Sequence, residues 1–372
     1  MHKIFGFLLS RWVLSFVFVA ILVALVWYFA PFIPALAGLL PRALIIVALF
    51  AVWLAVNLLL SLRRKQREDL LTIGIAGPGA GPSAADEELA AMAEKLKTSL
   101  ALLKKARGTR GYLYEQPWYV IIGPPGAGKT TALLNAGLKF PLAAELGQGA
   151  VAGVGGTRLC DWWFTENAVL IDTAGRYTTQ DSDAGVDKAG WEGFLDLLKR
   201  TRQRQALNGV VVAISLADIA SAPREERLAH ARAIRKRIKD LTERLTLKLP
   251  VYALLTKADL IAGFTEFFDD LDAEKRGQVW GTSFAANAAN PVTGFAEEFT
   301  ALTKRLDDRL LDLMQRERSP DRRAMITGFP AQFASLQAPL TEFLNEAFGG
   351  STLDPAPYLR GVYFASGTQE GT

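Results

Sequence analysis

The sequence predicts an α/β fold in which an N-terminal two-helix transmembrane hairpin precedes a domain with a mostly parallel sheet and helical additions. Two long uncharged apolar stretches near the N-terminus predict the hairpin. Behind them, short apolar runs such as VVVAIS and VYALLT alternate with helical patterns, as in parallel sheets. We expect three segments: the hairpin at 1–62, a juxtamembrane linker and amphipathic helix at 63–111, and the α/β domain at 112–372 with a helical insertion at about 265–350.

The two apolar stretches have the length and the flanks of membrane spans. Residues 12–30 and 43–62 contain no charged side chain, and each is close to the ~20 residues that a spanning helix needs. Basic residues such as Arg11 and Arg63 flank the pair, whereas only Arg42 lies between the stretches. The positive-inside rule then places both ends of this chain in the cytoplasm.

A cleaved export signal is the alternative interpretation of the first apolar stretch. Ala35-Leu36-Ala37 resembles a signal-peptidase site. The stretch is longer than a usual signal core, and cleavage would leave the following domain in the wrong compartment. The hairpin is therefore the preferred interpretation.

The remaining composition excludes several classes of site and partner. The single cysteine excludes a disulfide framework, and with only two histidines no His/Cys metal cluster is expected. The net charge of +4 is modest and partly juxtamembrane. It favours the anionic headgroups of a lipid bilayer, and we expect no nucleic acid partner.

Two amphipathic helices are predicted outside the sheet. After a Gly/Pro/Ala linker at 74–86, apolar residues recur at helical spacing through Arg107, and they are Leu89, Met92, Leu96, Leu100 and Leu103. Such a stripe usually packs on the helix's own domain; a partner-binding face is the alternative. A second helix at 224–246 is rich in basic residues, but interspersed acids and a buried stripe favour a solvated crossover helix.

The α/β pattern continues to the C-terminus. Strands are expected at 118–122, 159–164, 168–172, 209–215, 250–256 and 360–365. Helices are expected near 129–138, 189–206, 224–246, 294–317 and 330–348. The close spacing of LCDWWFT and NAVLID favours one antiparallel hairpin at a sheet edge.

A glycine-rich loop between the first strand and a helix predicts a P-loop nucleotide site. The pattern is GPPGAGKT, in which bare glycines let backbone N–H groups wrap phosphate, a lysine reaches the β/γ-phosphates and a threonine holds Mg²⁺. The helix that follows directs its N-terminus at the phosphates. The expected nucleotide contacts are Gly123, Pro124, Pro125, Gly126, Ala127, Gly128, Lys129, Thr130 and Thr131.

Two further motifs supply groups for Mg²⁺ and for the γ-phosphate. Thr157, in GGTR, precedes a strand and can complete the Mg²⁺ shell with Thr130. Asp172, in DTAG, ends an apolar strand and offers a carboxylate to the same ion, and Gly175 lies beside the γ-phosphate. The predicted metal ligands are therefore Thr130, Thr157 and Asp172. The predicted catalytic set is Lys129, Thr157, Gly175 and Arg176.

Base recognition is expected from two segments that follow strands. In Thr256-Lys257-Ala258-Asp259, the Asp259 carboxylate can accept from the guanine edge and Lys257 can lie along the ring. Ser366-Gly367-Thr368 can offer backbone N–H groups to the base carbonyl, with Thr282-Ser283 as a second candidate for that role. The expected cofactors are GTP or ATP, with Mg²⁺.

The complete motif set resembles the TRAFAC-type GTPases, the group that includes Ras and the translation factors. The domain at 112–372 is therefore expected to be P-loop GTPase-like. Two departures matter: Thr256 stands where asparagine is commoner, and Arg176 follows DTAG where many GTPases have the glutamine that orients water. Hydrolysis is left open.

Longer signatures resemble one family more specifically. They are YEQPWYVIIGPPGAGKTTAL, CDWWF, IDTAGRY, LTKADLIAGFTEFF and the C-terminal LRGVYFASGTQEGT. Together with the hairpin they are similar to the IcmF/TssM family of type VI secretion inner-membrane components. Family members are longer and continue into a third membrane helix and a large periplasmic part.

The resemblance implies partners that composition and spacing do not reveal. It implies a TssL/DotU-like inner-membrane protein, type VI baseplate proteins and an oligomeric assembled complex. An outer-membrane lipoprotein would be reached only through the periplasmic part, which this chain does not include. It also implies a multi-pass location in the bacterial inner membrane.

These observations predict an inner-membrane scaffold of type VI secretion whose cytoplasmic domain binds nucleoside triphosphate with Mg²⁺, with NTPase activity uncertain. One alternative is a structural scaffold with a non-catalytic nucleotide site. Another is an unrelated membrane-anchored GTPase.

Overall fold

The computed structural model forms two compact units, Met1–Gly77 and Pro78–Thr372. The first unit contains described helical residues at 43–53, whose large apolar side chains are all exposed or partly exposed. The residues that the structure describes are 19, 23–25, 27–29, 38, 43–53, 56, 84–107, 112–142, 157, 159–179, 184–286, 291–351 and 354–367.

The predicted membrane hairpin falls largely outside the described residues. Of the expected spans at 12–30 and 43–62, only parts are described, and these parts are helical. Within the described part of the chain, no helix combines the length and the apolar character needed to cross a bilayer. The hairpin therefore stays a prediction.

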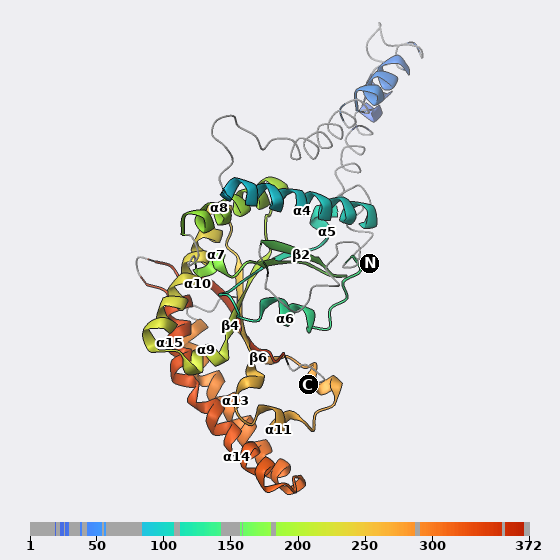
Figure 1. Cartoon of the computed structure of the whole chain (residues 1–372). Coiled ribbons are helices and arrows are strands. Elements are labelled where there is room, and N and C mark those ends of the chain that lie inside the picture. The colour runs from blue at the N-terminus through green and yellow to red at the C-terminus, as the bar shows by residue number, and fades with distance from the viewer. Residues whose placement is uncertain are drawn as a thin grey trace. The chain divides into compact units, whose positions relative to one another are not determined.

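The second unit is built on a seven-stranded sheet with the order β2-β3-β1-β4-β5-β7-β6 (Figure 1). Its strands are β1 Trp118–Ile122, β2 Cys160–Phe164, β3 Val169–Thr173, β4 Gly209–Ser215, β5 Pro250–Thr256, β6 Trp280–Ser283 and β7 Tyr358–Phe364. The pairs along β3-β1-β4-β5-β7 are parallel, whereas β2 and β6 pair antiparallel with β3 and β7. The mostly parallel sheet and the antiparallel edge at β2 are thus confirmed.

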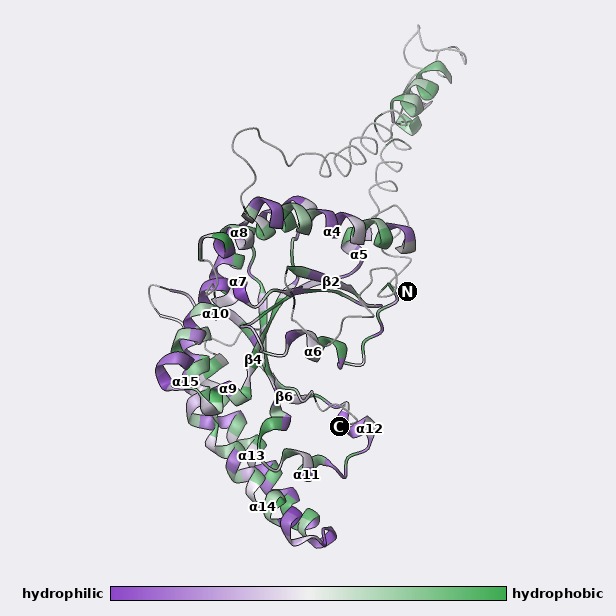
Figure 2. Cartoon of the chain, in the orientation of Figure 1, coloured by the Kyte–Doolittle hydropathy of each residue, from purple (hydrophilic) through white to green (hydrophobic). Residues whose placement is uncertain are grey.

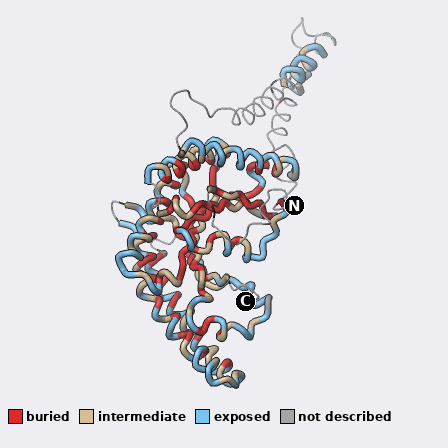
Figure 3. The backbone as a smooth tube through the Cα atoms, in the orientation of Figure 1, coloured by how far each residue is buried: buried red, intermediate tan, exposed pale blue. Residues whose placement is uncertain are grey.

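Apolar side chains lie on both faces of the sheet. The central strands are continuous apolar runs, so successive side chains that point to opposite faces are both apolar. Trp118, Val120 and Ile122 of β1 point into the larger core, while Ile121 points to the other face. There it meets Leu133 of helix α6 in a smaller cluster. Figure 3 shows the buried backbone concentrated in the strands and the exposed backbone on the outer helices.

Helices connect these strands and cover them. The described helices of this unit are α4 Ala84–Arg107, α5 Tyr112–Glu115, α6 Lys129–Leu134, α7 Arg176–Thr179, α8 Ala184–Thr201, α9 Leu216–Ser221, α10 Arg224–Leu245, α11 Phe264–Phe268, α12 Ala273–Arg276, α13 Pro291–Arg316, α14 Pro320–Ser335 and α15 Gln337–Phe348. Helices α13 and α14 lie side by side and extend from the β6 end of the sheet (Figure 1).

Helix α4 packs on the α/β unit itself. Met92, Leu96 and Leu103 belong to the larger core and are 0–2% exposed. Hydrophilic and hydrophobic residues alternate around α4 in Figure 2. Of the two interpretations of this stripe, packing on its own domain is the one that the structure adopts, and α8 is its main neighbour.

Strand β6 is not among the strands that the sequence predicts. It is short, lies at the sheet edge and contains Gly281, so it lacks the apolar run that marks the other strands. A Cβ at Gly281 would lie 2.3 Å from the carbonyl oxygen of Val362, so the close pairing with β7 requires glycine here.

Helix boundaries also differ from those expected. The helix predicted at 330–348 is two helices, since α14 starts ten residues earlier and ends at Ser335. Ser319 caps its N-terminus and Pro320 occupies the first turn, whereas Pro330 is accommodated inside the helix. Helix α8 covers Ala184–Thr201 instead of 189–206, and α6 stops at Leu134 instead of 138.

The packing of α4 predicts a large stability effect at Leu96. Leu96→Ala should lower the free energy of unfolding by about 2–5 kcal/mol, because it opens a cavity between α4 and the core. The measurement is urea unfolding of the chain in detergent micelles, followed by tryptophan fluorescence.

Leu311→Ala is the matched control, because Leu311 is also helical but 67% exposed. Its unfolding free energy should change by less than about 0.5 kcal/mol. Equal effects of the two substitutions would contradict the packing of α4 on this unit.

Candidate nucleotide-binding site

The P-loop sequence forms the connection between β1 and α6. Gly128 has φ +75°, a left-handed conformation that favours glycine, and it directly precedes the first residue of α6. Gly123 and Ala127 are buried, whereas Pro125 and Gly126 are exposed at the turn. The loop therefore presents its central backbone to solvent at the N-terminus of a helix, where anions are favoured.

Lys129 is folded back onto this loop. Its Nζ donates to the carbonyl oxygens of Gly123 at 2.8 Å and Pro124 at 3.0 Å, and the residue is 7% exposed. Burial lowers the pKa of Lys129 to about 8, partly opposed by the charge of Asp172. The ammonium thus closes the loop in a position from which it can exchange carbonyl oxygens for phosphate oxygens.

Thr130, Thr157 and Asp172, the three predicted metal ligands, lie together. The Thr130 hydroxyl donates to Asp172 Oδ2 at 2.5 Å and the Thr157 hydroxyl donates to the same atom at 2.8 Å. The two hydroxyl oxygens are 3.3 Å apart. Ligand oxygens on one edge of a Mg²⁺ octahedron lie roughly 3 Å apart, so this spacing suits such an ion.

The Asp172 carboxylate itself is buried and incompletely paired. It is 0% exposed, and its second oxygen, Oδ1, has no hydrogen-bond partner among the described residues. Burial raises the pKa of Asp172, against the lowering effect of the two threonine hydrogen bonds and Lys129. A buried carboxylate oxygen without a partner is unfavourable, and a divalent cation would satisfy it.

Gly175 lies directly against the P-loop. A Cβ at this position would be 2.5 Å from the backbone nitrogen of Pro125, so only glycine fits. The next helix, α7, continues the contact, since the Gly123 N–H donates to the Thr178 hydroxyl at 3.1 Å. The segment that follows β3 and the P-loop therefore form one packed surface.

Sequence reasoning missed two residues at this contact. They are Thr178, which holds the Gly123 amide, and Thr173, whose hydroxyl donates to the Ile121 carbonyl oxygen at 2.7 Å. Threonine side chains near a DTAG sequence carry no distinctive pattern, so only the folded arrangement reveals these hydrogen bonds.

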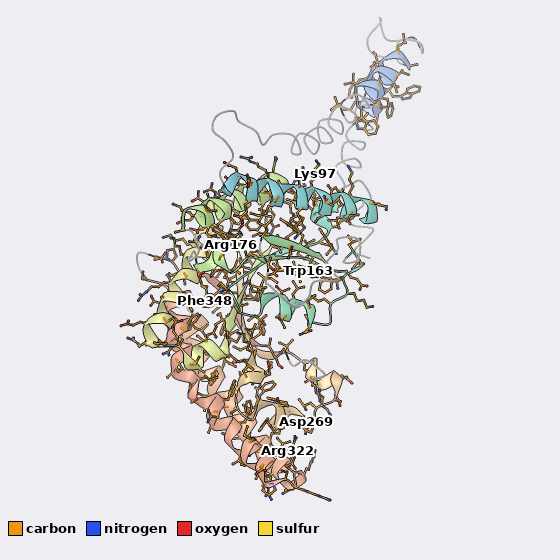
Figure 4. The ribbon with its side chains drawn as sticks, in the orientation of Figure 1. Lys97, Trp163, Arg176, Asp269, Arg322 and Phe348 are labelled. Carbon is orange, nitrogen blue, oxygen red and sulfur yellow. The ribbon has the colours of Figure 1, made fainter. Side chains whose placement is uncertain are left out.

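The predicted catalytic residue Arg176 is engaged elsewhere. Its guanidinium pairs with Glu88 of α4 and, at 3.1 Å, with Asp187 of α8. It also lies 5.0 Å from the ring centroid of Tyr177. Figure 4 shows Arg176 on the side of the unit where α4 and α8 lie. In this conformation Arg176 ties α7 to helices α4 and α8.

Thr256 is a buried residue that holds the P-loop by a hydrogen bond. Its motif predicts a contact with nucleotide, but Thr256 is 4% exposed and its hydroxyl donates to the carbonyl oxygens of Ala127 at 2.7 Å and Ile214 at 3.2 Å. This hydroxyl joins the P-loop to the end of β5, which explains how threonine can stand at a position where asparagine is commoner.

The two predicted base-recognition segments meet at the ends of β5 and β7. Asp259 Oδ1 accepts from the Gly367 N–H at 2.9 Å, and the Ala258 N–H donates to the Ala365 carbonyl oxygen at 3.1 Å. Gly367 also approaches Thr131 of α6, because a Cβ there would lie 3.4 Å from the threonine methyl group. These segments therefore border α6, the helix that follows the P-loop.

The alternative base segment, Thr282-Ser283, lies in edge strand β6 instead. The Ser283 hydroxyl is 2.7 Å from the Tyr363 hydroxyl. Lys257, by contrast, lies beside Asp259 and has φ +60°. Gly155, Gly156 and Thr368 lie outside the described residues.

The chain matches known proteins over most of its length. Residues 184–372 match the IcmF-related N-terminal domain. The type VI secretion system component TssM1 of Pseudomonas aeruginosa is 54% identical to this chain over 305 residues, which is 80% of the chain and 28% of that protein. The chain thus spans 28% of the length of this relative. The two matches agree with the resemblance found in the sequence, and the chain belongs to the IcmF/TssM family.

Proposed function

We propose that this chain is part of an inner-membrane scaffold of type VI secretion, and that its α/β unit binds GTP or ATP together with Mg²⁺. The observation that carries the nucleotide proposal is the convergence of Thr130, Thr157 and Asp172 beside the P-loop, where one buried Asp172 oxygen has no partner among the described residues. If these hydrogen bonds served only to hold the loop, a buried carboxylate oxygen without a partner would be unfavourable and without purpose.

Each part of the site has a defined role in this proposal. The backbone N–H groups from Gly126 to Thr130 and the Lys129 ammonium would hold the phosphates. Thr130, Thr157 and Asp172 would supply oxygen ligands to the ion, which neutralises phosphate charge when bound. The segments at 256–259 and 365–367 would border the base, and Asp259 would favour guanine.

The secretion role rests on the family and on the apolar N-terminus. The matched relative is a type VI secretion system component, and eight large apolar residues of the first unit are at least 47% exposed. Exposed apolar surface of that extent suits a lipid environment. We therefore propose a multi-pass inner-membrane location with both ends of this chain cytoplasmic. The proposed partners are a TssL/DotU-like protein and type VI baseplate proteins.

A non-catalytic nucleotide site is the second candidate, and the position of Arg176 favours it. The side chain that stands in place of a water-orienting glutamine is held by Glu88 and Asp187. In this alternative the scaffold binds nucleotide for structural support and releases no phosphate.

One titration tests both candidates. The chain in detergent micelles is titrated with fluorescent GTP and ATP analogues with and without Mg²⁺, and phosphate release is then followed with unlabelled nucleotide. Binding with release supports an NTPase, and binding without release supports the non-catalytic site. Absence of binding would overturn the nucleotide proposal.

Lys129→Ala should abolish most of the binding. It removes the only P-loop side chain placed to pair with phosphate, so affinity for the analogues should fall by roughly 30-fold or more. Lys139→Ala, which changes an exposed lysine beyond the same helix, should bind as the unaltered chain does. Equal affinities of the two variants would contradict the assigned role of Lys129.

Binding should weaken above about pH 8, because the pKa of Lys129 in the free protein is about 8. Phosphate would raise that pKa, so binding above pH 8 requires proton uptake. The affinity should therefore fall by up to roughly tenfold per pH unit there and stay level from about pH 7 to 8. The measurement is the same titration across this range.

Lys129→Arg is the control for the pH dependence. A guanidinium stays protonated throughout the range, so the variant should bind more weakly but with a level pH profile. An identical slope in the variant and the unaltered chain would assign the titration to another group.

Gly175→Ala should disturb the loop. The added methyl group would clash with the Pro125 backbone nitrogen at 2.5 Å and displace the phosphate-binding amides, so affinity should fall by roughly tenfold. Gly328→Ala in α14 adds the same group where no atom lies within 4 Å, and it should leave binding unchanged. Unchanged binding by Gly175→Ala would show that the close contact is not needed.

A further inference from the structure

We propose that Arg176 is a latch that couples the nucleotide site to helix α4: bound triphosphate draws its guanidinium away from Glu88 and thereby loosens the first turns of α4. This inference rests on the proposed nucleotide binding and extends it to a second element. It concerns a helix that lies outside the sheet and is the first described helix of the unit that begins at Pro78.

The N-terminal part of α4 is held by a close fit that centres on Glu88. The Glu88 side chain is 10% exposed and one of its oxygens pairs with Arg176. Its other oxygen, Oε2, is buried and has no hydrogen-bond partner among the described residues. A Cβ at Gly190 of α8 would lie 3.0 Å from that atom. Glycine at this position of α8 therefore leaves room for the Glu88 carboxylate.

The next residue of α4 fits into a second glycine position of α8. A Cβ at Gly193 would lie 2.9 Å from two methyl carbons of Leu89. Glu88 and Leu89 thus both pack closely against glycine positions of α8. The ion pair between Arg176 and Glu88 adds an electrostatic interaction to this packing. By contrast, the middle of α4 is anchored by the buried side chains of Met92 and Leu96.

The backbone connects Arg176 directly to the nucleotide site. It follows Gly175, which is packed on Pro124 and Pro125 of the P-loop, and it begins α7. Two residues further on, Thr178 accepts from the Gly123 N–H. Any shift of this segment in response to phosphate therefore moves the residue that holds α4.

A bound triphosphate would compete with two acidic side chains for Arg176. One guanidinium serves two carboxylates, those of Glu88 and Asp187, and Asp187 is 0% exposed. A triphosphate beside Gly175 would bring several further negative charges, which compete for the same cation. Loss of Arg176 would leave the Glu88 carboxylate buried with neither oxygen paired, and such a charge moves toward water.

The predicted change is local to the start of α4. The amides of 88–92, whose helical acceptors are the carbonyls of 84–88, should lose protection, whereas those of 96–103 should keep it because Met92, Leu96 and Leu103 stay buried in the core. The measurement is hydrogen exchange by mass spectrometry on the chain in detergent micelles, with and without a non-hydrolysable GTP analogue and Mg²⁺. Exchange at 88–92 should rise by roughly fivefold or more upon binding.

Glu88→Gln tests the latch without nucleotide. The substitution preserves the shape of the side chain but removes the charge that holds Arg176, so 88–92 should exchange faster in the free protein and respond less to the analogue. Exchange in β4 reports whether the rest of the unit stays folded.

Glu94→Gln is the matched control on the same helix. It removes the same charge from the exposed pair with Lys97, in which both side chains are at least 49% exposed (Figure 4). This variant should exchange as the unaltered chain does at 88–92 and should respond fully to the analogue.

The outcomes separate the latch from the nucleotide proposal. If fluorescence titration shows the analogue bound while exchange at 88–92 is unchanged, the latch is overturned and nucleotide binding stands. If the analogue does not bind, both are overturned. Glu88→Gln with unaltered exchange at 88–92 in the free protein would also overturn the latch, whether or not nucleotide binds.

Discussion

The arrangement of the site depends on one buried carboxylate at the end of a central strand. Parallel pairing of β1 with β3 sets Asp172 opposite Ile121, one residue before β1 ends, so the charge lies beside the P-loop. Away from water, this carboxylate needs donors, and Thr130 and Thr157 supply them from the helix and from the segment before β2. In the part of the chain that the structure describes, nothing pairs with its other oxygen, which makes this point of the fold suited to a cation.

A second group of charges, centred on Arg176, follows Asp172 by four residues along the chain. Gly175 contacts the P-loop, and Arg176 holds the acidic residues of α4 and α8. Lys129 and Arg176 are thus both satisfied by protein groups in this conformation, the former by carbonyl oxygens and the latter by carboxylates. A bound triphosphate would compete for both cations, because its oxygens carry more negative charge than either set of partners.

The match to the family model and the nucleotide site occupy different parts of the chain, although the similarity to TssM1 extends over 80% of the chain. The matched family domain begins at residue 184, after the P-loop, Thr157 and Asp172. The proposed nucleotide binding therefore rests on local geometry, whereas membership in the IcmF/TssM family rests on sequence similarity. The two lines of evidence are independent, so the family assignment does not depend on the proposed nucleotide binding.

Local patterns in the sequence determined β1, β4 and β5, because a strand buried on both faces needs a continuous apolar run. They also determined α4 through its apolar spacing and predicted the P-loop through its glycines. Tertiary structure alone decided the short edge strand β6, the support of the loop by Thr256 and the engagement of Arg176 with Glu88. These features join residues far apart in the chain, and a hydrogen bond or ion pair between distant residues leaves no periodic pattern in either segment.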